Sequence, residues 1–287
     1  MTLRLGIPSN NRMFDTIFNL FNDAEIPLIR QNRSNFGHGK IWKDIEVYYL
    51  RSRDIPLSIF NGGLDCGIST DNVLTELNIQ TNPLLRFNFN YHRMVLAAPE
   101  KHELSYFKGK RIASAYPNIT KKFFADNGVY DIKILDLSGS IEAYPKLHLA
   151  DGIVDIVETG TSLKENNLVE VQTIMEASPI LIGRNDLDDE QKHALAFIVK
   201  SLQAAMKAKD FRHLLIHLDD KYSSEFFDLI QKYHDVIFGF EKLATNRFEL
   251  FINHNSVSKF MKIVSEQFPQ ILIEVCPSNM IFYGDCE

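Results

Sequence analysis

The chain has 287 residues, of which 45% are hydrophobic and 24% charged, a composition that argues against disorder, a fibre or a repeat array. Its 31 Lys and Arg against 37 Asp and Glu give a formal net charge of -6, which argues against nucleic acid or an anionic membrane as a partner. Three widely spaced cysteines fit neither a disulfide framework nor a CxxC zinc site. The opening residues lack the apolar run of a signal peptide, and no stretch approaches the ~18 to 20 apolar residues that span a bilayer. We therefore expect a cytoplasmic protein.

Strand and helix patterns alternate over residues 3–183. After the first strand, Phe14, Ile17 and Phe21 recur at helical spacing, which indicates a strand-turn-helix unit. Strands are expected at 3–8, 45–50, 62–69, 94–97, 111–115, 131–137, 151–157, 169–174 and 178–183, and helices at 13–24, 55–60, 118–128 and 141–150. This alternation predicts an open α/β sheet in two lobes, with sites at the carboxyl ends of strands.

A long amphipathic helix over residues 188–210 marks a boundary, since Leu195, Ile198 and Leu202 share one face. The elements that follow read strand, helix, strand, strand, helix, strand, at 212–218, 223–233, 235–240, 247–253, 256–268 and 271–275. That order predicts a ferredoxin-like module.

Two histidines in this module have the spacing of a helical metal pair. They are His213 and His217, four residues apart. The alternation of Leu214 and Ile216 between them indicates a strand instead, so we favour a structural role over metal binding.

The strongest local signal for chemistry runs from Asp155 to Ser162. Asp155 and Glu158 punctuate a buried strand, and the turn at its carboxyl end consists of Thr159, Gly160, Thr161 and Ser162. Backbone N–H groups and hydroxyls of such a turn can converge on one phosphate, with the acids facing neighbouring sugar hydroxyls. The alternative is a plain β-turn in which Thr161 or Ser162 caps the next helix.

Further blocks occur in a fixed order along the chain. They are Arg53 to Pro56, Gly63 to Gly67 with Asp71, His92 to Pro99, Gly109 to Ala113 with Tyr116 to Asn118, Ser138 to Glu142 with Pro145, and Leu149 to Asp155 running into Glu158 to Leu168. Together they resemble the long form of the ATP phosphoribosyltransferase family. The resemblance implies transfer of phosphoribosyl from phosphoribosyl pyrophosphate to N1 of ATP, with release of pyrophosphate, as the first step of histidine biosynthesis.

The resemblance also implies an architecture: an α/β, two-lobed catalytic core like that of periplasmic binding proteins, plus a C-terminal ferredoxin-like regulatory domain. Lobe I would comprise residues 1–93 and 182–210, lobe II residues 94–181 with the phosphoribosyl pyrophosphate loop, and the regulatory domain residues 211–287. Long-form members bind histidine there as an allosteric inhibitor and assemble into homodimers and homohexamers, whereas short-form members rely on a separate subunit. A periplasmic solute-binding protein shares the two-lobed architecture, but the missing signal peptide and the phosphate turn argue against it.

Site residues follow from the resemblance as well. It implies that residues 159–162 bind the 5-phosphate and that Asp155 and Glu158 lie near the ribose hydroxyls, acting in catalysis with Arg12. The candidates for contacts to ATP or pyrophosphate are Arg12, Arg53, Asp71 and Arg93, and each of these arginines has an alternative interpretation as a salt-bridge residue. Mg²⁺ is the implied cofactor, carried by the substrate phosphates.

One departure from the family pattern lies in the first turn. Many members have Lys-Gly-Arg there, and this chain has Asn10, Asn11 and Arg12. Asn11 can adopt the left-handed backbone of a glycine, but nothing at Asn10 replaces the charge of the lysine. The alternative function is therefore a catalytically impaired or non-catalytic ligand-binding relative on the same scaffold.

Overall fold

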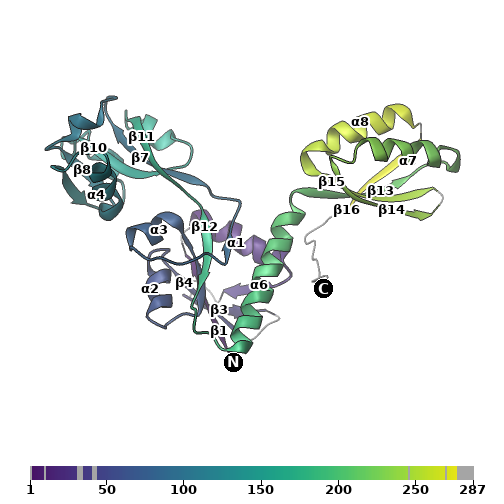
Figure 1. The fold of residues 1–287 in the computed structure, drawn as a ribbon, viewed down its shortest axis with the longest axis horizontal. Coiled ribbons are helices and arrows are strands. Elements are labelled where there is room, and N and C mark those ends of the chain that lie inside the picture. Colours follow the sequence, from purple (N-terminus) through teal and green to yellow (C-terminus); the bar gives the residue numbers. More distant parts are fainter. Residues whose placement is uncertain are drawn as a thin grey trace. The chain divides into compact units, whose positions relative to one another are not determined.

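The computed structural model describes residues 2–9, 11–30, 35–40, 44–244, 246–268 and 270–276, apart from the side chains of Asn11 and Arg12. The chain forms two compact units (Figure 1), which we describe separately. The first comprises Met1–Asp15, Ile29–Gly39 and Lys43–Lys192, and the second comprises Thr16–Leu28, Lys40–Trp42 and His193–Glu287. Within the described ranges, no helix combines the length and the apolar character that crossing a membrane requires.

The first sheet has seven strands in the order β2-β3-β4-β1-β5-β12-β6. They are β1 (Leu3–Pro8), β2 (Leu28–Arg30), β3 (Phe36–Gly39), β4 (Ile45–Leu50), β5 (Cys66–Thr70), β6 (Leu85–Arg86) and β12 (Pro179–Gly183). Strand β1 runs parallel to β4 and β5, whereas β12 is antiparallel to β5. Helices α1 (Asn11–Asp23), α2 (Asp54–Phe60) and α3 (Asp71–Glu76) follow β1, β4 and β5 in the chain.

The second sheet of this unit has five strands in the order β11-β7-β10-β8-β9. They are β7 (His92–Ala98), β8 (Arg111–Ser114), β9 (Lys133–Asp136), β10 (Gly152–Val157) and β11 (Val169–Ala177). The other elements are α4 (Pro117–Asp126), α5 (Thr161–Glu165) and the 3₁₀ turns η1 (Leu104–Phe107) and η2 (Ile141–Ala143). Both faces of β7 are buried, since Met94 and Leu96 pack in one core cluster and Val95 and Ala97 in another. The chain passes between the two sheets over residues 87–91 and again at Ser178.

The structure corrects the sequence analysis in one helix and adds several short elements. The helix expected at 141–150 is wrong, because only the turn Ile141–Ala143 forms there. Pro145 lacks a backbone N–H and its ring clashes with the preceding helical turn, so the pattern cannot continue as a helix. Strands β2, β3 and β6 and helix α3 were not predicted, because none exceeds six residues and each carries too little pattern.

The second unit contains most of α6 (Asp189–Ala208) and a four-stranded antiparallel sheet in the order β14-β15-β13-β16. Its elements are β13 (Phe211–His217), η3 (Asp220–Tyr222), α7 (Ser223–Lys232), β14 (Ile237–Ala244), β15 (Arg247–Asn253), η4 (His254–Ser256), α8 (Val257–Gln267) and β16 (Leu272–Cys276). Helices α7 and α8 lie on one face of this sheet (Figure 1), and its core is drawn entirely from residues 214–273. The expected order of strands and helices is confirmed.

The histidines of this sheet lie on a strand, as the alternation predicted. His213 Nε2 faces Glu249 Oε1 at 2.5 Å, and His217 Nε2 faces Glu274 Oε1 at 3.6 Å. The ring of His213 also stacks on Phe251, with centroids 4.8 Å apart. The two histidines are therefore paired with different carboxylates on neighbouring strands.

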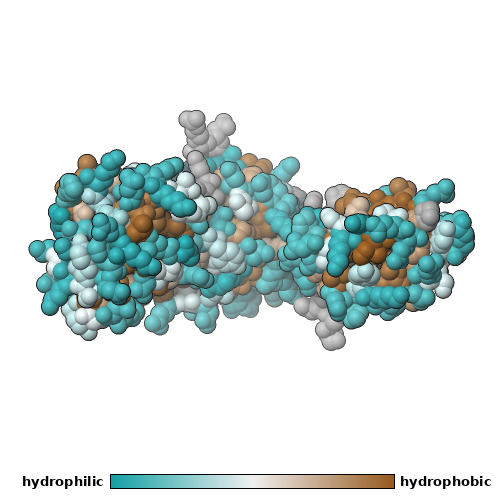
Figure 2. All heavy atoms as spheres, turned by 90° about the horizontal axis from the view of Figure 1, so that it is seen from above, coloured by the Kyte–Doolittle hydropathy of each residue, from teal (hydrophilic) through white to brown (hydrophobic). Residues whose placement is uncertain are grey.

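Hydrophilic side chains cover most of the face drawn in Figure 2, and hydrophobic residues reach that surface in small groups. In the four-stranded sheet, several large apolar side chains are exposed: Phe238, Phe240, Leu243, Leu272 and Val275. These residues lie on β14 and β16, the two edge strands of the sheet, and contiguous exposed apolar side chains are typical of surfaces that meet a partner.

Candidate functional site

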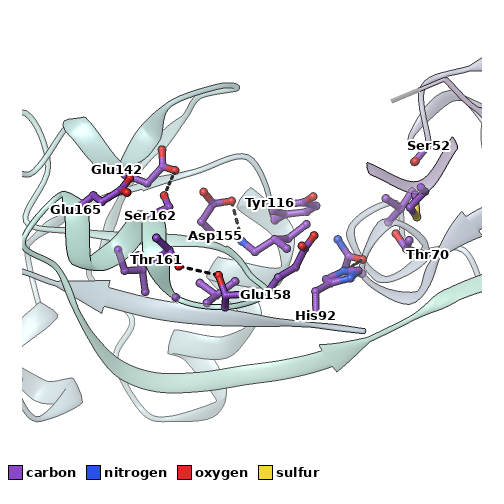
Figure 3. A pocket seen from close by; sticks show the side chains of 18 residues that line it. Ser52, Thr70, His92, Tyr116, Glu142, Asp155, Glu158, Thr161, Ser162 and Glu165 are labelled. Atoms are coloured by element: carbon purple, nitrogen blue, oxygen red, sulfur yellow. Dashed lines mark hydrogen bonds between the residues drawn. The ribbon is translucent and has the colours of Figure 1, made fainter. Parts of the chain in front are cut away.

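A cavity of about 560 Å³ lies in the first unit, with walls from both of its sheets (Figure 3). The wall from the seven-stranded sheet includes Ser52, Thr70 and Asn72, and the wall from the five-stranded sheet includes Glu142, Asp155, Glu165 and residues 156–163. Strands β5 and β10 end at Thr70 and Val157, so the cavity lies at carboxyl ends of strands, as the fold class predicts.

The turn after β10 forms one side of this cavity. Gly160 has a φ of 78°, the left-handed region that glycine adopts without strain, and it is the residue that precedes α5. No side chain caps this helix, so neither Thr161 nor Ser162 is the cap that the alternative interpretation required. Thr159 Oγ1 and Thr161 Oγ1 lie 3.0 Å apart, and Ser162 Oγ donates to Glu142 Oε1 at 2.6 Å. All three of these hydroxyl-bearing residues line the cavity.

Four carboxylates line the same cavity, those of Asp155, Glu158, Glu142 and Glu165. Asp155 Oδ1 accepts a hydrogen bond from the Ile156 backbone N–H at 2.7 Å. Carboxylate oxygens are suited to accept hydrogen bonds from hydroxyl groups of a ligand. The sequence singled out Asp155 and Glu158, and named Glu142 and Glu165 only within motifs.

The implied Mg²⁺ fits this donor set only as an ion shared with a ligand. Among the described residues, no group of three or more His, Cys, Asp or Glu side chains is arranged to hold a metal. Mg²⁺ in proteins is held by one or two carboxylates plus substrate phosphates and water, and the cavity offers carboxylates of this kind.

The four candidates for ATP or pyrophosphate contacts lie in different places. Arg53 is exposed at the start of α2, and its positive charge acts to lower the pKa of the Tyr116 phenol in the cavity wall. Arg93 donates from Nη1 to Glu170 Oε1 at 2.6 Å and to Thr173 Oγ1 at 3.1 Å, and it is not among the residues that line the cavity.

Asp71 pairs with Arg86 and accepts the Ser178 backbone N–H at 2.9 Å, on a separate cavity of about 900 Å³. Burial alone would raise the pKa of Asp71, but these partners together hold it below its ordinary value. The side chain of Arg12, like Asn10 and the side chain of Asn11, lies outside the described part of the chain.

Three polar residues at the junction of the two sheets were not singled out as site residues in the sequence: Asn72, His92 and Tyr116. Asn72 and His92 are buried and Tyr116 is partly buried, and the sequence named His92 and Tyr116 only within motifs. Burial and the charge of Asp155 raise the pKa of Tyr116 to about 12, although the Asn72 amide lowers it. In Figure 3, Tyr116 and His92 lie between the Asp155 group and Thr70. These residues come from α3, β7 and the loop after β8, so their proximity depends on the tertiary fold.

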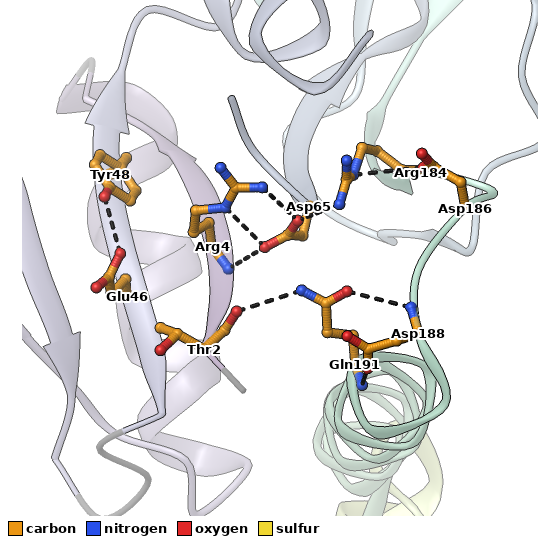
Figure 4. A network of polar contacts seen from close by, with 9 residues as sticks. All are labelled: Thr2, Arg4, Glu46, Tyr48, Asp65, Arg184, Asp186, Asp188 and Gln191. Carbon is orange, nitrogen blue, oxygen red and sulfur yellow. Dashed lines mark hydrogen bonds and ion pairs between the residues drawn. The ribbon is translucent and has the colours of Figure 1, made fainter. Parts of the chain in front are cut away.

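A buried ion-pair network stands apart from the cavity (Figure 4). Asp65 is fully buried and accepts from Arg4 Nη2 at 2.8 Å and from Arg184 Nη2 at 2.7 Å. Desolvation is the largest effect on the pKa of Asp65 and would raise it, but the two arginines together lower it. Asp65 comes directly before β5, so the network lies at the start of that strand, whereas Thr70 lies at its carboxyl end. The network joins β1, β5 and the segment after β12.

The fold and the cavity define an α/β protein with a polar cavity, lined by hydroxyl groups and carboxylates, at the carboxyl ends of its strands. The family model of HisG, ATP phosphoribosyltransferase, matches residues 51–204. A protein of Phocaeicola vulgatus named ATP phosphoribosyltransferase is 32% identical over 238 residues, which cover 79% of this chain and 81% of that protein. One of Methanocella arvoryzae with the same name is 28% identical, over 76% of this chain and 77% of that protein.

A solved structure shares the fold. It is the ATP phosphoribosyl transferase (HisG:HisZ) complex from Thermotoga maritima, in which the matched chain is 29% identical with a TM-score of 0.63. The match covers 72% of this chain and 99% of that one, so about a quarter of this chain lies outside it. The chain belongs to the ATP phosphoribosyltransferase family.

Proposed function

We propose that this chain transfers phosphoribosyl from phosphoribosyl pyrophosphate to N1 of the adenine of ATP and releases pyrophosphate, the first step of histidine biosynthesis. The observation that carries the proposal is the cavity in which the turn 159–162 and the carboxylates of Asp155 and Glu158 meet. Family membership, over most of the chain, supports the same reaction.

The donor lies with its 5-phosphate on the turn 159–162. The left-handed Gly160 turns the backbone so that N–H groups and the hydroxyls of Thr159, Thr161 and Ser162 can reach one phosphate. Asp155 and Glu158, next to the turn in the cavity lining, accept hydrogen bonds from the ribose hydroxyls. These contacts hold C1 of the ribose facing the open part of the cavity.

The chemical step needs positioning and charge compensation and no covalent nucleophile. As the bond from C1 to the pyrophosphate oxygen breaks, positive charge develops on the ribose ring, and Asp155 and Glu158 stabilise it. Adenine N1 forms the new bond from the opposite side. Mg²⁺ bound to pyrophosphate would compensate the charge of the leaving group, with Arg53 and Arg12 as the protein groups that neutralise it further.

The C-terminal residues 211–287 form a ferredoxin-like regulatory domain in this proposal, beside a catalytic core of residues 1–93 and 182–210 (lobe I) and 94–181 (lobe II). The match to the Thermotoga maritima structure leaves out about a quarter of the chain, a share that fits the size of this domain, and the strand order of the sheet also supports the division. The domain binds histidine as a feedback inhibitor. Its exposed apolar side chains support assembly into a homodimer or homohexamer in the cytoplasm.

The experiment is a continuous assay for phosphoribosyl-ATP with both substrates and Mg²⁺, run with and without histidine. Turnover that histidine suppresses supports both halves of the proposal. A chain ending at residue 210 should keep any turnover and lose the histidine response, and inhibition that persists would place the effector site elsewhere. Binding of phosphoribosyl pyrophosphate without turnover would instead support the catalytically impaired relative, which the lost cation at Asn10 favours.

A further inference from the structure

Asn72 carries an unsatisfied amide group at the wall of the cavity. The residue is 1% exposed, in the first turn of α3, and it lines the cavity beside Val73 and Thr70. Its Nδ2 is buried and makes no hydrogen bond of good geometry to another described residue, although the amide is close enough to the Tyr116 phenol to lower the pKa of that group. Its Oδ1 lies 3.0 Å from His92 Nε2. A buried amide donor without a partner in a cavity wall points to a ligand or to a different hydrogen-bond arrangement.

The tautomer of a neutral His92 ring follows from the contact of its other ring nitrogen. Nδ1 lies 3.1 Å from the Asn90 carbonyl oxygen, which can only accept, so Nδ1 donates. In the neutral ring the remaining nitrogen, Nε2, carries a lone pair and must accept. The group of Asn72 that satisfies it is therefore the amide NH₂, which a half-turn of the Asn72 amide brings there in place of Oδ1.

This arrangement leaves one polar atom of Asn72 for the cavity. With Nδ2 donating to His92, Oδ1 faces the side of Tyr116, whose pKa is already sensitive to the Asn72 amide. A carbonyl oxygen has two lone pairs, so Oδ1 can accept from the Tyr116 hydroxyl and from a ligand together. His92 thus fixes Asn72 as an acceptor toward the cavity.

We propose that Asn72 determines base specificity by accepting a hydrogen bond from the exocyclic 6-amino group of adenine, with His92 as the residue that positions its amide. The inference rests on the proposed function. In Figure 3, Thr161 and Ser162 lie on one side of the cavity and Thr70 lies on the other. Asn72 and Val73 follow Thr70 in the chain, so the acceptor base in this proposal approaches from their side.

The hydrogen bond would strengthen as the reaction proceeds. When adenine N1 bonds to C1 of the ribose, the purine gains positive charge and its 6-amino group becomes a stronger donor. An acceptor fixed beforehand is therefore worth more in the transition state than in the bound substrate. Loss of Asn72 should lower kcat with ATP more than it raises KM.

The probe is purine ribonucleoside triphosphate, which keeps N1 and lacks the 6-amino group. The measured quantity is the ratio of kcat/KM for ATP to that for the probe, in the wild type and in Asn72→Leu, Asn72→Asp and His92→Phe. The intrinsic difference in reactivity of the two bases and the folded fraction of each variant cancel when these ratios are compared. Asn72→Leu should reduce the ratio about tenfold or more, since its side chain accepts nothing.

The other variants separate specificity from folding. Asn72→Asp keeps an oxygen toward the cavity and should stay within about threefold of the wild-type ratio, whereas His92→Phe releases the amide and should lower it by about threefold or more. Ser69→Ala, three residues before Asn72 in the chain, is the matched control: it removes a partly buried hydrogen bond to the Ser52 backbone carbonyl and should leave the ratio unchanged. An unchanged ratio in Asn72→Leu, or a loss in Asn72→Asp equal to that in Asn72→Leu, overturns the proposal.

Binding keeps the inference separate from the proposed reaction. If the wild type shows no turnover, calorimetry of ATP and the probe gives the same comparison through their Kd values. If the wild type binds ATP more tightly than the probe and Asn72→Leu removes this difference, the role assigned to Asn72 is supported although the transferase proposal has failed. Equal affinities in the wild type, or no binding of either nucleotide, overturn it.

Discussion

The carboxylate of Glu76 accepts the backbone N–H of Asn118, with both oxygens 3.1 Å from the nitrogen. It also accepts the N–H of Ile119 at 3.0 Å, and the Asn118 side chain donates back to the Glu76 carbonyl oxygen at 2.8 Å. Glu76 is 1% exposed at the end of α3, and Asn118 lies in the first turn of α4. The pair ties the helix after β5 to the helix after β8, and so holds Tyr116 beside the cavity.

Replacing Glu76 by alanine should destabilise the first unit by about 2–4 kcal/mol, because the first turn of α4 loses its acceptor in a buried environment. Glu76→Gln keeps an acceptor oxygen and should lose less. Urea unfolding, followed by the fluorescence of the tyrosines and Trp42, measures both. Equal stability of the alanine variant and the wild type would show that water satisfies these N–H groups.

The sequence predicted the elements whose pattern is long or strongly periodic. Strand Gly152–Val157 is confirmed, because its residues form an almost continuous apolar run. The order of strands and helices in the C-terminal sheet is also confirmed, because burial alternates along strands such as Arg247–Asn253. The helix expected over 141–150 failed because Pro145 sits inside an apolar spacing that looks helical.

Part of the candidate site was likewise predictable from the sequence, and part was not. Asp155 to Ser162 is contiguous in the chain, so its composition was visible before the fold was known. Asn72, His92 and Tyr116 become neighbours only through the order of the strands, and a buried polar side chain leaves no periodic signal. Arg93 matched a motif, yet the structure pairs it with Glu170 on the neighbouring strand β11.

The Asp65 network predicts a specific dependence of stability on pH. Its folded-state pKa lies below the ordinary 3.8, so the network stabilises the fold above that pH and this contribution is lost as the pH falls through the folded value. Asp65→Asn should be less stable than the wild type by about 2–4 kcal/mol at pH 7. This loss is somewhat smaller than the loss caused by breaking a fully buried ion pair, because Arg4 and Arg184 are partly exposed.

The measurement is the free energy of unfolding of both proteins from pH 7 to pH 3. The gap between wild type and Asp65→Asn should narrow toward pH 3, since protonation removes the same charge that the substitution removes. Other carboxyls with lowered pKa, including Asp71 and Asp151, titrate in both proteins and cancel. A gap that stays constant would contradict the role assigned to the Asp65 charge.

Gly160→Val should raise KM for phosphoribosyl pyrophosphate about tenfold more than KM for ATP, because a β-branched residue resists the left-handed backbone by about 1–2 kcal/mol and distorts the turn. Gly160→Asn is the matched control, since asparagine tolerates that conformation, and should change KM much less. Thr161→Ala should act in the same direction by removing a hydroxyl. Equal effects on both substrates would mean that the turn does not hold the phosphate.

Cys66 should be inert toward thiol reagents in the folded protein. It is fully buried in β5, and burial raises the pKa of its thiol far above the ordinary value, so little thiolate forms. Cys276 is partly exposed and should react first. Labelling with iodoacetamide before and after unfolding, followed by peptide mass spectrometry, distinguishes the sites and also reads Cys286. Labelling of Cys66 under native conditions would reveal opening of the seven-stranded sheet.

The four-stranded sheet and its helices should fold without the rest of the chain, because their core includes no residue before Leu214. Phe248 is fully buried at the centre of that core, with its ring 5.0 Å from that of Phe226. Phe248→Ala should lower the free energy of unfolding by about 3–5 kcal/mol. This loss is comparable to the whole stability that a single core supplies in a domain of this size.

A fragment of residues 209–287 should therefore show a cooperative thermal transition by circular dichroism, and the same fragment with Phe248→Ala should show none. Leu243→Ala is the control, since that side chain is 44% exposed and its loss should change stability by no more than about 0.5 kcal/mol. An unfolded wild-type fragment would show that this core depends on contacts with the rest of the chain, and the regulatory domain would then have to be defined with α6 included.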